Sequence, residues 1–545
     1  MKKVEPGKEF WKDARAPYAA QTSMERAMLL CDIPEIAAHH EPDKVALWFE
    51  ERSWTFTELR DRCWKLSNAL LGISSHGDRV AILSENCPEY GECYYGVPGA
   101  GMCLTFLNYR LTPRELTYII NNNTPSAIIV QQKYLETIRK IRPELTSVKT
   151  VIVIGGEAQD AISYDALIAR GEAKRPDIAI AEDDLCWLLY TSGTTGLPKG
   201  AMLSHRNLIA SIANSMASGA EALPDEIPLF MFPQFHVAGY VLPMYHLRCW
   251  TVVLLGAFDA TSFLEAVQRY RVTSAPMAPT MLAMMLENPA LGDYDLSSLR
   301  SFGYGASSMP LEVLRRGFKV FPGVSFATGF GMTELAGNVM ALSKQDHVRA
   351  AEKGLAIIGS VGKQMPLSRV RVLLDDNSDA PPNVPGEIVI KGDQVLKGYW
   401  NNPKATEESF IDGWFRSGDV GRFDENGYLT IVDRKKDMIL TGGENVYPRE
   451  VEEVLYEHEC VLEAAVVGTP DPKWGESVVA VIALREGTNI RSSDLIAFCK
   501  DRIASYKKPK FVCYVPALPR NASGKVLKRE LRERIASGEL PLDAA

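Results

Sequence analysis

The residues best suited to chemistry in this sequence lie in one short loop, YTSGTTGLPKG, from Tyr190 to Gly200. The loop holds three glycines, three threonines, one serine and a single lysine, a poor composition for a helix or a strand. Glycines let backbone N–H groups converge, hydroxyls add donors and Lys199 adds a positive charge, so the loop suits a polyphosphate. A solvated turn is the simpler alternative. The loop is not a Walker motif, because Lys199 follows Pro198 and precedes Gly200.

The segments around this loop are typical of an α/β fold. The loop follows DLCWLLY, a pattern that predicts a buried strand, and α/β folds bind ligands beyond such strand ends. Similar apolar runs are RVAILS, SAIIVQ, TVIVIGG and TVVLLG. Continuous runs of this kind favour parallel strands covered by helices on both faces. TFTELRDRCWKLSNALLG predicts one such helix, with Thr55 as its N-cap and Gly72 near its end.

The pattern changes toward the C-terminus. Beyond about residue 380, short strands alternate with turns, and Asn426-Gly427 predicts a hairpin. From residue 437 onward, helices and strands mix over a compact stretch the size of a small domain. We therefore expect a large N-terminal domain over residues 1–435 and a small α+β domain over residues 437–545, joined near DRKKD.

Length and composition set limits on the class of protein. A chain of 545 residues with 46% hydrophobic and 23% charged residues is typical of a folded globular protein, and its length predicts two to four domains. The net charge of -8 argues against broad binding to nucleic acid. The ten cysteines form no CxxC pair, which favours reduced thiols in the cytosol over a zinc or redox site.

Targeting and membrane signals are not recognised in the sequence. The N-terminal lysines precede no apolar run, so we expect no secretory signal. The most apolar region, FHVAGYVLPMYHLRCWTVVLLGAF, is interrupted by His236, Pro243, His246 and Arg248, so we expect buried core elements and no membrane span. The protein is therefore expected to be cytoplasmic.

Seven segments in order resemble the adenylate-forming enzymes, the family of acyl-CoA synthetases, peptide-synthetase adenylation domains and firefly luciferase. They are YTSGTTGLPKGAMLSHRN, FPQFHVAG, FGYGASS, ATGFGMTE, GWFRSGDVGRFDENGY, DRKKDMILTGGENVYPREVE and LPRNASGKVLKREL. The resemblance implies a large N-terminal domain of two βαβ-type subdomains plus a small β-barrel. A small mobile C-terminal domain would follow a hinge at Lys436.

The resemblance also implies where ATP and AMP bind. The phosphate loop would hold the β- and γ-phosphates, Phe330 would lie against adenine and Asp419 would bind the ribose. Glu334 would hold Mg2+, while Lys525 would neutralise charge at the α-phosphate. The implied ATP- and AMP-binding residues are Thr191, Ser192, Gly193, Thr194, Thr195, Lys199, Gly305, Ala306, Ser307, Thr328, Gly329, Phe330, Gly331, Thr333, Asp419, Arg434 and Lys525.

The same resemblance implies an acyl pocket and a thiol channel. The pocket would be lined by His236, Ala238, Gly239, Tyr304, Gly305, Ala306, Thr328 and Gly329, and coenzyme A would meet Gly442, Gly443 and Glu444. Thr328 departs from the glutamine that many members carry, so the acid of a named relative does not transfer to this chain. The spacing around Lys525 is also one that acyltransferases modify in related bacterial enzymes, which makes acetylation of Lys525 a hypothesis.

The implied reaction has two steps. A carboxylate attacks the α-phosphate of ATP to give an acyl-adenylate and pyrophosphate, and CoA then takes the acyl group. The implied catalytic residues are Lys525, Thr333, Glu334, His236 and Arg434. Two alternatives stay open, a stand-alone enzyme that loads a carrier protein and a non-catalytic ATP-binding protein. The acid could be a medium-chain fatty, aryl or aryl-alkanoic carboxylate, and a homodimer is expected from the family.

Overall fold

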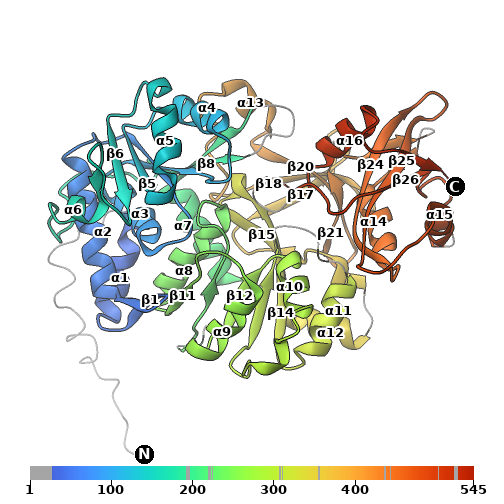
Figure 1. Ribbon diagram of the computed structural model, residues 1–545, viewed down its shortest axis with the longest axis horizontal. Helices are drawn as coiled ribbons and strands as arrows, with labels where there is room; N and C mark the ends of the chain where they lie inside the picture. The colour runs from blue at the N-terminus through green and yellow to red at the C-terminus, as the bar shows by residue number, and fades with distance from the viewer. Residues whose placement is uncertain are drawn as a thin grey trace, which may run out of the picture.

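The computed structural model of the protein describes residues 27–544 except 192–196, 219–222, 224, 306–308, 310, 354–355, 435–436, 442–443, 501 and 521–525. Three of the four apolar runs and DLCWLLY enter one seven-stranded sheet (Figure 1). Its strands are β3 (Arg79–Leu83), β4 (Cys103–Leu107), β5 (Ala127–Gln131), β6 (Thr150–Ile154), β7 (Ile162–Ser163), β8 (Leu185–Thr191) and β9 (Lys199–Ser204). Their order is β7-β6-β5-β3-β4-β8-β9, and neighbours are parallel except β8 and β9.

Helices cover both faces of this sheet. Alternate residues of β3 divide between two cores, with Val80 packed in a cluster that includes α2, α3 and α6, and Ala81 in a cluster with α4 and α5. The Thr55 hydroxyl accepts from the Glu58 N–H at the start of α2, and Gly72 caps its end, so both predicted helix ends are confirmed. The helices are α1 (Ile33–His40), α2 (Phe56–Leu71), α3 (Pro88–Gly99), α4 (Pro113–Asn123), α5 (Leu135–Ile141), α6 (Tyr164–Ile168) and α7 (His205–Ala217).

Two further sheets belong to the large N-terminal part of the chain. β1 (Val45–Phe49), β2 (Arg52–Thr55), β10 (Leu229–Phe230) and β11 (Val252–Leu254), which contains part of TVVLLG, form a four-stranded sheet in the order β10-β11-β1-β2. The other sheet runs in sequence order through β12 (Ser274–Met277), β13 (Ser301–Tyr304), β14 (Ser325–Met332), β15 (Gly337–Leu342) and β16 (Lys363–Gln364). Its first three strands are parallel. Accompanying helices are α8 (Val241–Leu247), α9 (Ala260–Tyr270), α10 (Pro279–Leu286), α11 (Leu311–Val320) and α12 (Lys344–Lys353).

The β-rich section forms an antiparallel sheet, as the turn signals predict. Gly427 has a φ of 80° in the connection between β20 and β21, which confirms the predicted hairpin. The elements are β17 (Arg369–Leu373), β18 (Gly386–Lys391), α13 (Pro403–Glu408), β19 (Phe410–Ile411), β20 (Trp414–Phe423) and β21 (Leu429–Arg434).

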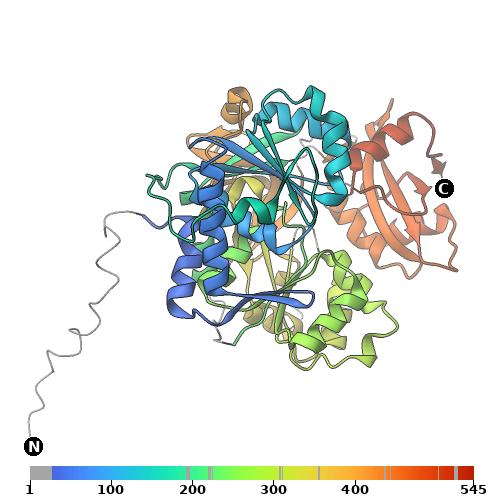
Figure 2. The ribbon, with the colours of Figure 1, turned by 60° about the vertical axis from the view of Figure 1, so that its left-hand side comes forward.

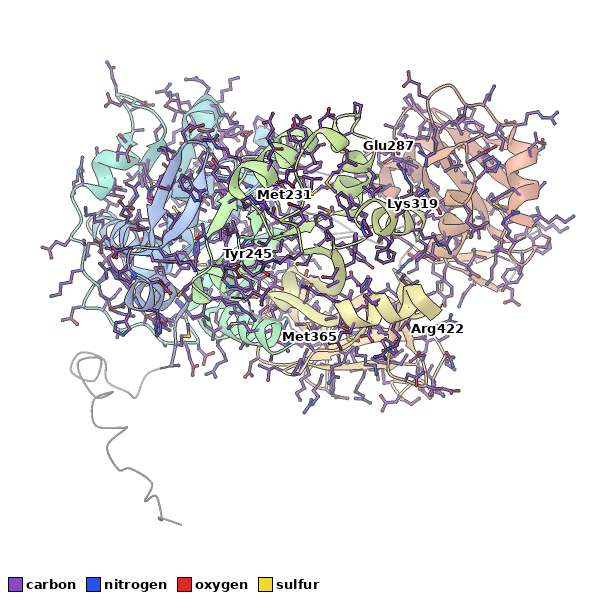
Figure 3. All side chains as sticks on the ribbon, turned by 90° about the horizontal axis from the view of Figure 1, so that it is seen from below. Met231, Tyr245, Glu287, Lys319, Met365 and Arg422 are labelled. Carbon is purple, nitrogen blue, oxygen red and sulfur yellow. The ribbon has the colours of Figure 1, made fainter. Side chains whose placement is uncertain are left out.

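The C-terminal elements build a sheet of their own, at one end of the molecule in Figures 1 and 2. They are β22 (Ile439–Thr441), β23 (Glu444–Val446), α14 (Pro448–Tyr456), β24 (Val461–Asp471), β25 (Gly475–Leu484), α15 (Ser492–Lys500), β26 (Phe511–Tyr514), α16 (Lys528–Ala536) and β27 (Asp543–Ala544). Glu287, just after α10, lies on the side that faces them (Figure 3), and Arg485 Nη1 is 3.8 Å from its Oε1. The predicted α/β class, with a smaller C-terminal α+β part, is confirmed.

Lys436, the predicted hinge, lies outside the described residues. All ten cysteines are free thiols. None of the described helices has the length and apolar character needed to cross a bilayer.

Candidate active site

The ends of the glycine-rich loop are held together by a β-hairpin. Thr191, the last residue of β8, is paired with Lys199, the first residue of β9. The Thr191 hydroxyl donates to the Lys199 carbonyl at 3.4 Å. Ser192, Gly193, Thr194 and Thr195 lie outside the described residues. The loop therefore joins two antiparallel strands at the sheet edge.

Tyr399 connects this loop to the predicted metal ligand. Lys199 Nζ lies 5.2 Å from the centroid of the Tyr399 ring, and the Tyr399 hydroxyl donates to Glu334 Oε1 at 3.0 Å. Burial and the nearby carboxylate of Glu334 raise the pKa of Tyr399, which keeps the hydroxyl protonated as a donor. Thr333 and Glu334 follow β14 directly, in a short 3-10 turn over Thr333–Leu335. The structure thus brings Lys199 and Glu334 to one place.

Strands β13 and β14 bring a second group of predicted residues together. Tyr304 and Thr328 are paired across the parallel strands, and the Thr328 hydroxyl donates to the Tyr304 carbonyl at 2.8 Å. The backbone N–H of Gly305 donates to the Met277 carbonyl at 3.4 Å. Ligands of α/β folds bind beyond such carboxyl ends of parallel strands.

Gly329, Phe330 and Gly331 of β14 pair with residues of the antiparallel strand β15. A side chain at Gly329 would start 2.6 Å from Asn338 Nδ2, so only glycine fits there without displacing that amide. The register shifts between Phe330 and Gly331, and a Cβ at Gly331 would meet the Gly337 carbonyl oxygen at 1.9 Å. Glycines at these two positions therefore allow β14 and β15 to approach closely.

The Tyr304 hydroxyl is part of a buried hydrogen-bond chain. It lies 2.9 Å from His347 Nε2, and His347 Nδ1 lies 2.9 Å from the Ser343 carbonyl oxygen. A carbonyl only accepts, so Nδ1 carries the proton and Tyr304 donates to Nε2. Burial raises the pKa of Tyr304, while the positive charge of Arg449 among the C-terminal elements acts in the opposite direction. Arg449 is therefore close enough to affect Tyr304 electrostatically.

His236 caps the short helical turn over Val237–Tyr240. Its Nδ1 accepts the Ala238 N–H at 3.2 Å, which leaves the proton of the neutral ring on Nε2. Burial lowers the pKa of His236 to about 4, so the ring is neutral at pH 7. A side chain at Gly239 would start 2.1 Å from the Tyr94 hydroxyl, so Gly239 accommodates a core tyrosine.

Asp419 and Arg434, the two predicted ribose-side residues, are opposite each other on β20 and β21. Asp419 is only 4% exposed, and its backbone N–H donates to Ser417 Oγ at 3.1 Å. The Arg434 side chain lies outside the described part of the structure. The backbone register therefore supports a shared location for the two residues.

Comparison with known proteins identifies the family. The family model described as AMP-binding enzyme matches residues 34–400, and the model of the AMP-binding enzyme C-terminal domain matches residues 450–525. The chain belongs to the AMP-binding enzyme family. This confirms the resemblance to the adenylate-forming enzymes.

Relatives of this AMP-binding enzyme match along nearly its whole length. It is 38% identical over 504 residues to feruloyl-CoA synthase from Amycolatopsis sp, covering 92% of this chain and 98% of that protein. It is 35% identical over 501 residues to indoleacetate–CoA ligase from Aromatoleum aromaticum, covering 91% and 96%. The crystal structure of the anthranilate CoA ligase AuaEII in complex with anthranoyl-AMP matches with a TM-score of 0.86 and 26% identity, covering 94% of this chain and 98% of that chain.

Glu334 of this AMP-binding enzyme fits the role of a magnesium ligand. Among the described residues, no group of three His, Cys, Asp or Glu side chains could hold a metal by itself. Magnesium that accompanies ATP takes most of its ligands from phosphates and water and needs only one or two carboxylates. A single carboxylate held by Tyr399 matches that requirement.

Some predicted residues of this AMP-binding enzyme lie outside the described residues, namely Ala306, Ser307, Gly442, Gly443 and Lys525. Glu444 is described and is exposed at the start of β23. Conversely, sequence reasoning missed Tyr399, Asn338 and His347. The one sequence signal for Tyr399 is the segment KGYW, in which two aromatic residues follow a glycine.

Proposed function

We propose that this AMP-binding enzyme is an ATP-dependent acid:CoA ligase that forms AMP. The observation that carries the proposal is the meeting of Lys199 and Glu334 at Tyr399, beside the carboxyl end of β14. A cation near a carboxylate that can hold Mg2+ suits a metal-bound polyphosphate. Full-length relatives named as CoA ligases on carboxylic acids support the same reaction.

In the first step a carboxylate oxygen bonds to the α-phosphorus of ATP, and the bond to the bridging oxygen breaks to release pyrophosphate. A carboxylate is already nucleophilic, so the protein needs to position charges and needs no general base. We assign Thr191 and Lys199 to the β- and γ-phosphates, and Thr333 and Lys525 to the α-phosphate. Bound magnesium would neutralise charge on the phosphate oxygens.

In the second step the thiol of CoA bonds to the acyl carbon, AMP leaves and the thiol proton passes to solvent. We assign His236 to the junction of the acyl pocket and the thiol channel. Its Nε2–H is oriented by the Ala238 N–H and can donate to an acyl oxygen. Gly442, Gly443 and Glu444 would border the pantetheine arm, because small residues leave room for a thin chain.

The acid is proposed to have an apolar body, of aryl, aryl-alkanoic or medium-chain fatty type. The names of the relatives, which refer to ferulate and indoleacetate, support aromatic acids in particular. The predicted wall consists mainly of small or neutral side chains such as Ala238, Gly329 and Thr328. A second charged group on the acid is therefore not required.

A pyrophosphate-release assay over a panel of acids, with ATP, Mg2+ and CoA, tests the proposal. We expect acid-dependent pyrophosphate and one thioester per AMP for at least one aryl or fatty acid. Replacing CoA by a pantetheinylated carrier protein should lower thioester formation. Absence of acid-dependent pyrophosphate across the panel would reject the proposal, and a preference for the carrier protein would reassign the acyl acceptor.

We also propose a cytosolic location, supported by the ten free cysteines. Homodimerisation is a proposal from the family alone. Light scattering after size-exclusion chromatography tests it, with twice the chain mass of 60.3 kDa as the expected result.

A further inference from the structure

The segment that carries Tyr399 is fixed at both ends to candidate active-site elements. The Leu396 N–H donates to the Glu334 carbonyl at 2.8 Å, and the Trp400 N–H donates to the Gly200 carbonyl at 2.8 Å. Between them, Met202 of β9 exchanges backbone hydrogen bonds with Lys397 and Gly398, both at 3.0 Å. Residues 396–400, here called the strap, therefore lie antiparallel along β9 and run from Glu334 to the end of the phosphate loop.

The strap is also anchored through side chains. The Trp400 indole N–H donates to the Asn122 carbonyl at 3.1 Å, and the Arg79 guanidinium lies 5.2 Å from the Trp400 ring. The Tyr399 N–H donates to the Thr406 hydroxyl at 2.9 Å, and Tyr399 is only 8% exposed. The position of the Tyr399 ring is thus determined by its own backbone and by both neighbours.

Tyr399 contacts two groups of opposite charge with different parts of its side chain. Its hydroxyl donates to Glu334 Oε1 at 3.0 Å, which fixes the rotation of that carboxylate. The face of its ring lies 5.2 Å from Lys199 Nζ, within the range of a cation–π interaction. One rigid side chain therefore sets the positions of an ammonium group from β9 and a carboxylate from the turn after β14.

We propose that Tyr399 is a positioning residue that holds Glu334 and Lys199 for magnesium-bound ATP, an inference that rests on the proposed function. The hydroxyl acts on the metal ligand, and the ring acts on the lysine that meets the phosphates. The two effects are separable, because phenylalanine keeps the ring and loses only the hydroxyl. Leucine loses both contacts.

The test compares Tyr399→Phe and Tyr399→Leu with a matched control. Tyr428 has the same two contacts elsewhere: its hydroxyl donates to Asp346 Oδ1 at 2.9 Å, and Lys363 Nζ lies 4.5 Å from its ring. Tyr428→Phe therefore removes an equivalent hydroxyl from a similarly buried ring. This hydroxyl contacts neither Glu334 nor Lys199. Affinity is measured by isothermal titration calorimetry, for a non-hydrolysable ATP analogue with Mg2+ and for the same analogue with a chelator.

We expect Tyr399→Phe to weaken binding of the magnesium-bound analogue by about tenfold, the scale of one lost hydrogen bond to a charged group. Binding of the metal-free analogue should stay within about twofold, because the Lys199 contact remains. Tyr399→Leu should weaken binding of both forms, and Tyr428→Phe should change neither. Thermal unfolding midpoints check that each variant is folded.

Wild-type affinity for the magnesium-bound analogue in folded Tyr399→Phe would overturn the inference. Equal losses in the presence and absence of Mg2+ would overturn it as well, since the hydroxyl would then act on the fold or on the nucleotide alone. Failure of the proposed function looks different, because the wild-type protein would then release no acid-dependent pyrophosphate or form no CoA thioester, whatever Tyr399→Phe does to the affinity for the analogue.

Discussion

At the scale of single residues, burial keeps two histidines of the large N-terminal part neutral. Burial lowers the pKa values of His236 and His246 to about 4. His236 borders the proposed pocket, where a neutral ring can donate one hydrogen bond without adding charge. His246 lies at the end of α8, 2% exposed, with its Nδ1 2.8 Å from the Tyr95 hydroxyl. The neutral state of His246 therefore concerns the stability of the fold.

The first prediction concerns His246 and pH. The unfolded chain protonates this histidine near its ordinary pKa of 6.5, whereas the folded protein does so only near 4. The unfolded state thus binds more protons between these values. The free energy of unfolding should therefore be at its full value above pH 6.5 and fall by up to about 1.4 kcal/mol per pH unit below it.

His246→Gln should reduce this dependence, seen as a smaller loss of thermal midpoint between pH 7.0 and pH 5.0. Replacement of the exposed His40 by glutamine serves as the control. An identical pH dependence of the thermal midpoint in wild type and His246→Gln would contradict the lowered pKa of His246.

The second prediction concerns Asp419, the proposed ribose ligand. Asp419→Ala should weaken ATP binding by about 2–3 kcal/mol, the scale for hydrogen bonds to a charged group. Asp471, 8% exposed and held by Lys510 at 2.6 Å, is the comparison, because Asp471→Ala also removes a buried carboxylate. Unchanged ATP affinity in folded Asp419→Ala would show that this carboxylate serves only the local structure of β20 and β21.

At the scale of elements, local pattern predicts the strands and helices well and the strap poorly. RVAILS, SAIIVQ and TVIVIGG become strands because continuous apolar residues are buried on both faces wherever they fall in a covered sheet. LKGYW has no such periodicity, and its strand-like form depends on backbone bonds to β9, nearly two hundred residues earlier in the chain. Local sequence therefore does not predict the position of Tyr399 in the site, whereas motifs identify Lys199 and Glu334.

The third prediction tests the strap. Gly398 has a φ of 137°, and a Cβ there would meet Thr406 Cγ2 at 2.8 Å. Gly155 also has a positive φ, of 75°, but its Cβ would meet no heavy atom within 4 Å. Both alanine variants should lose about 1–2 kcal/mol of stability through backbone strain. Only Gly398→Ala should in addition weaken ATP binding, because it displaces the strap. Equal ATP affinities of the two variants would contradict this role of the strap.

At the scale of the whole molecule, the C-terminal elements contact the rest of the chain through charged groups. Arg485 meets Glu287, and the charge of Arg449 reaches Tyr304. Exposed ion pairs contribute little stability, so a contact of this kind is compatible with a part that changes its orientation. The proposed hinge at Lys436 and the proposed roles of Lys525 and Gly443 depend on such a movement.

The fourth prediction separates the two steps. If Lys525 reaches the α-phosphate only during adenylation, Lys525→Ala should slow acid-dependent ATP–pyrophosphate exchange by about a hundredfold or more, the scale of one lost preorganised charge. Thioester formation from a chemically prepared acyl-adenylate and CoA should be nearly unchanged. Equal losses in both assays would mean that Lys525 serves both steps from one position. That result would contradict a movement of the C-terminal part between the two steps.

The proposed function requires the carboxylate of the acid to attack the α-phosphate of ATP, and an isotope experiment follows this step. An acid accepted in the panel is labelled with oxygen-18 in both carboxyl oxygens and incubated with the wild-type protein, ATP, Mg2+ and CoA. We expect AMP that carries one labelled oxygen, pyrophosphate that carries none and a thioester that keeps the other labelled oxygen. Unlabelled AMP, or label in pyrophosphate or inorganic phosphate, would contradict it.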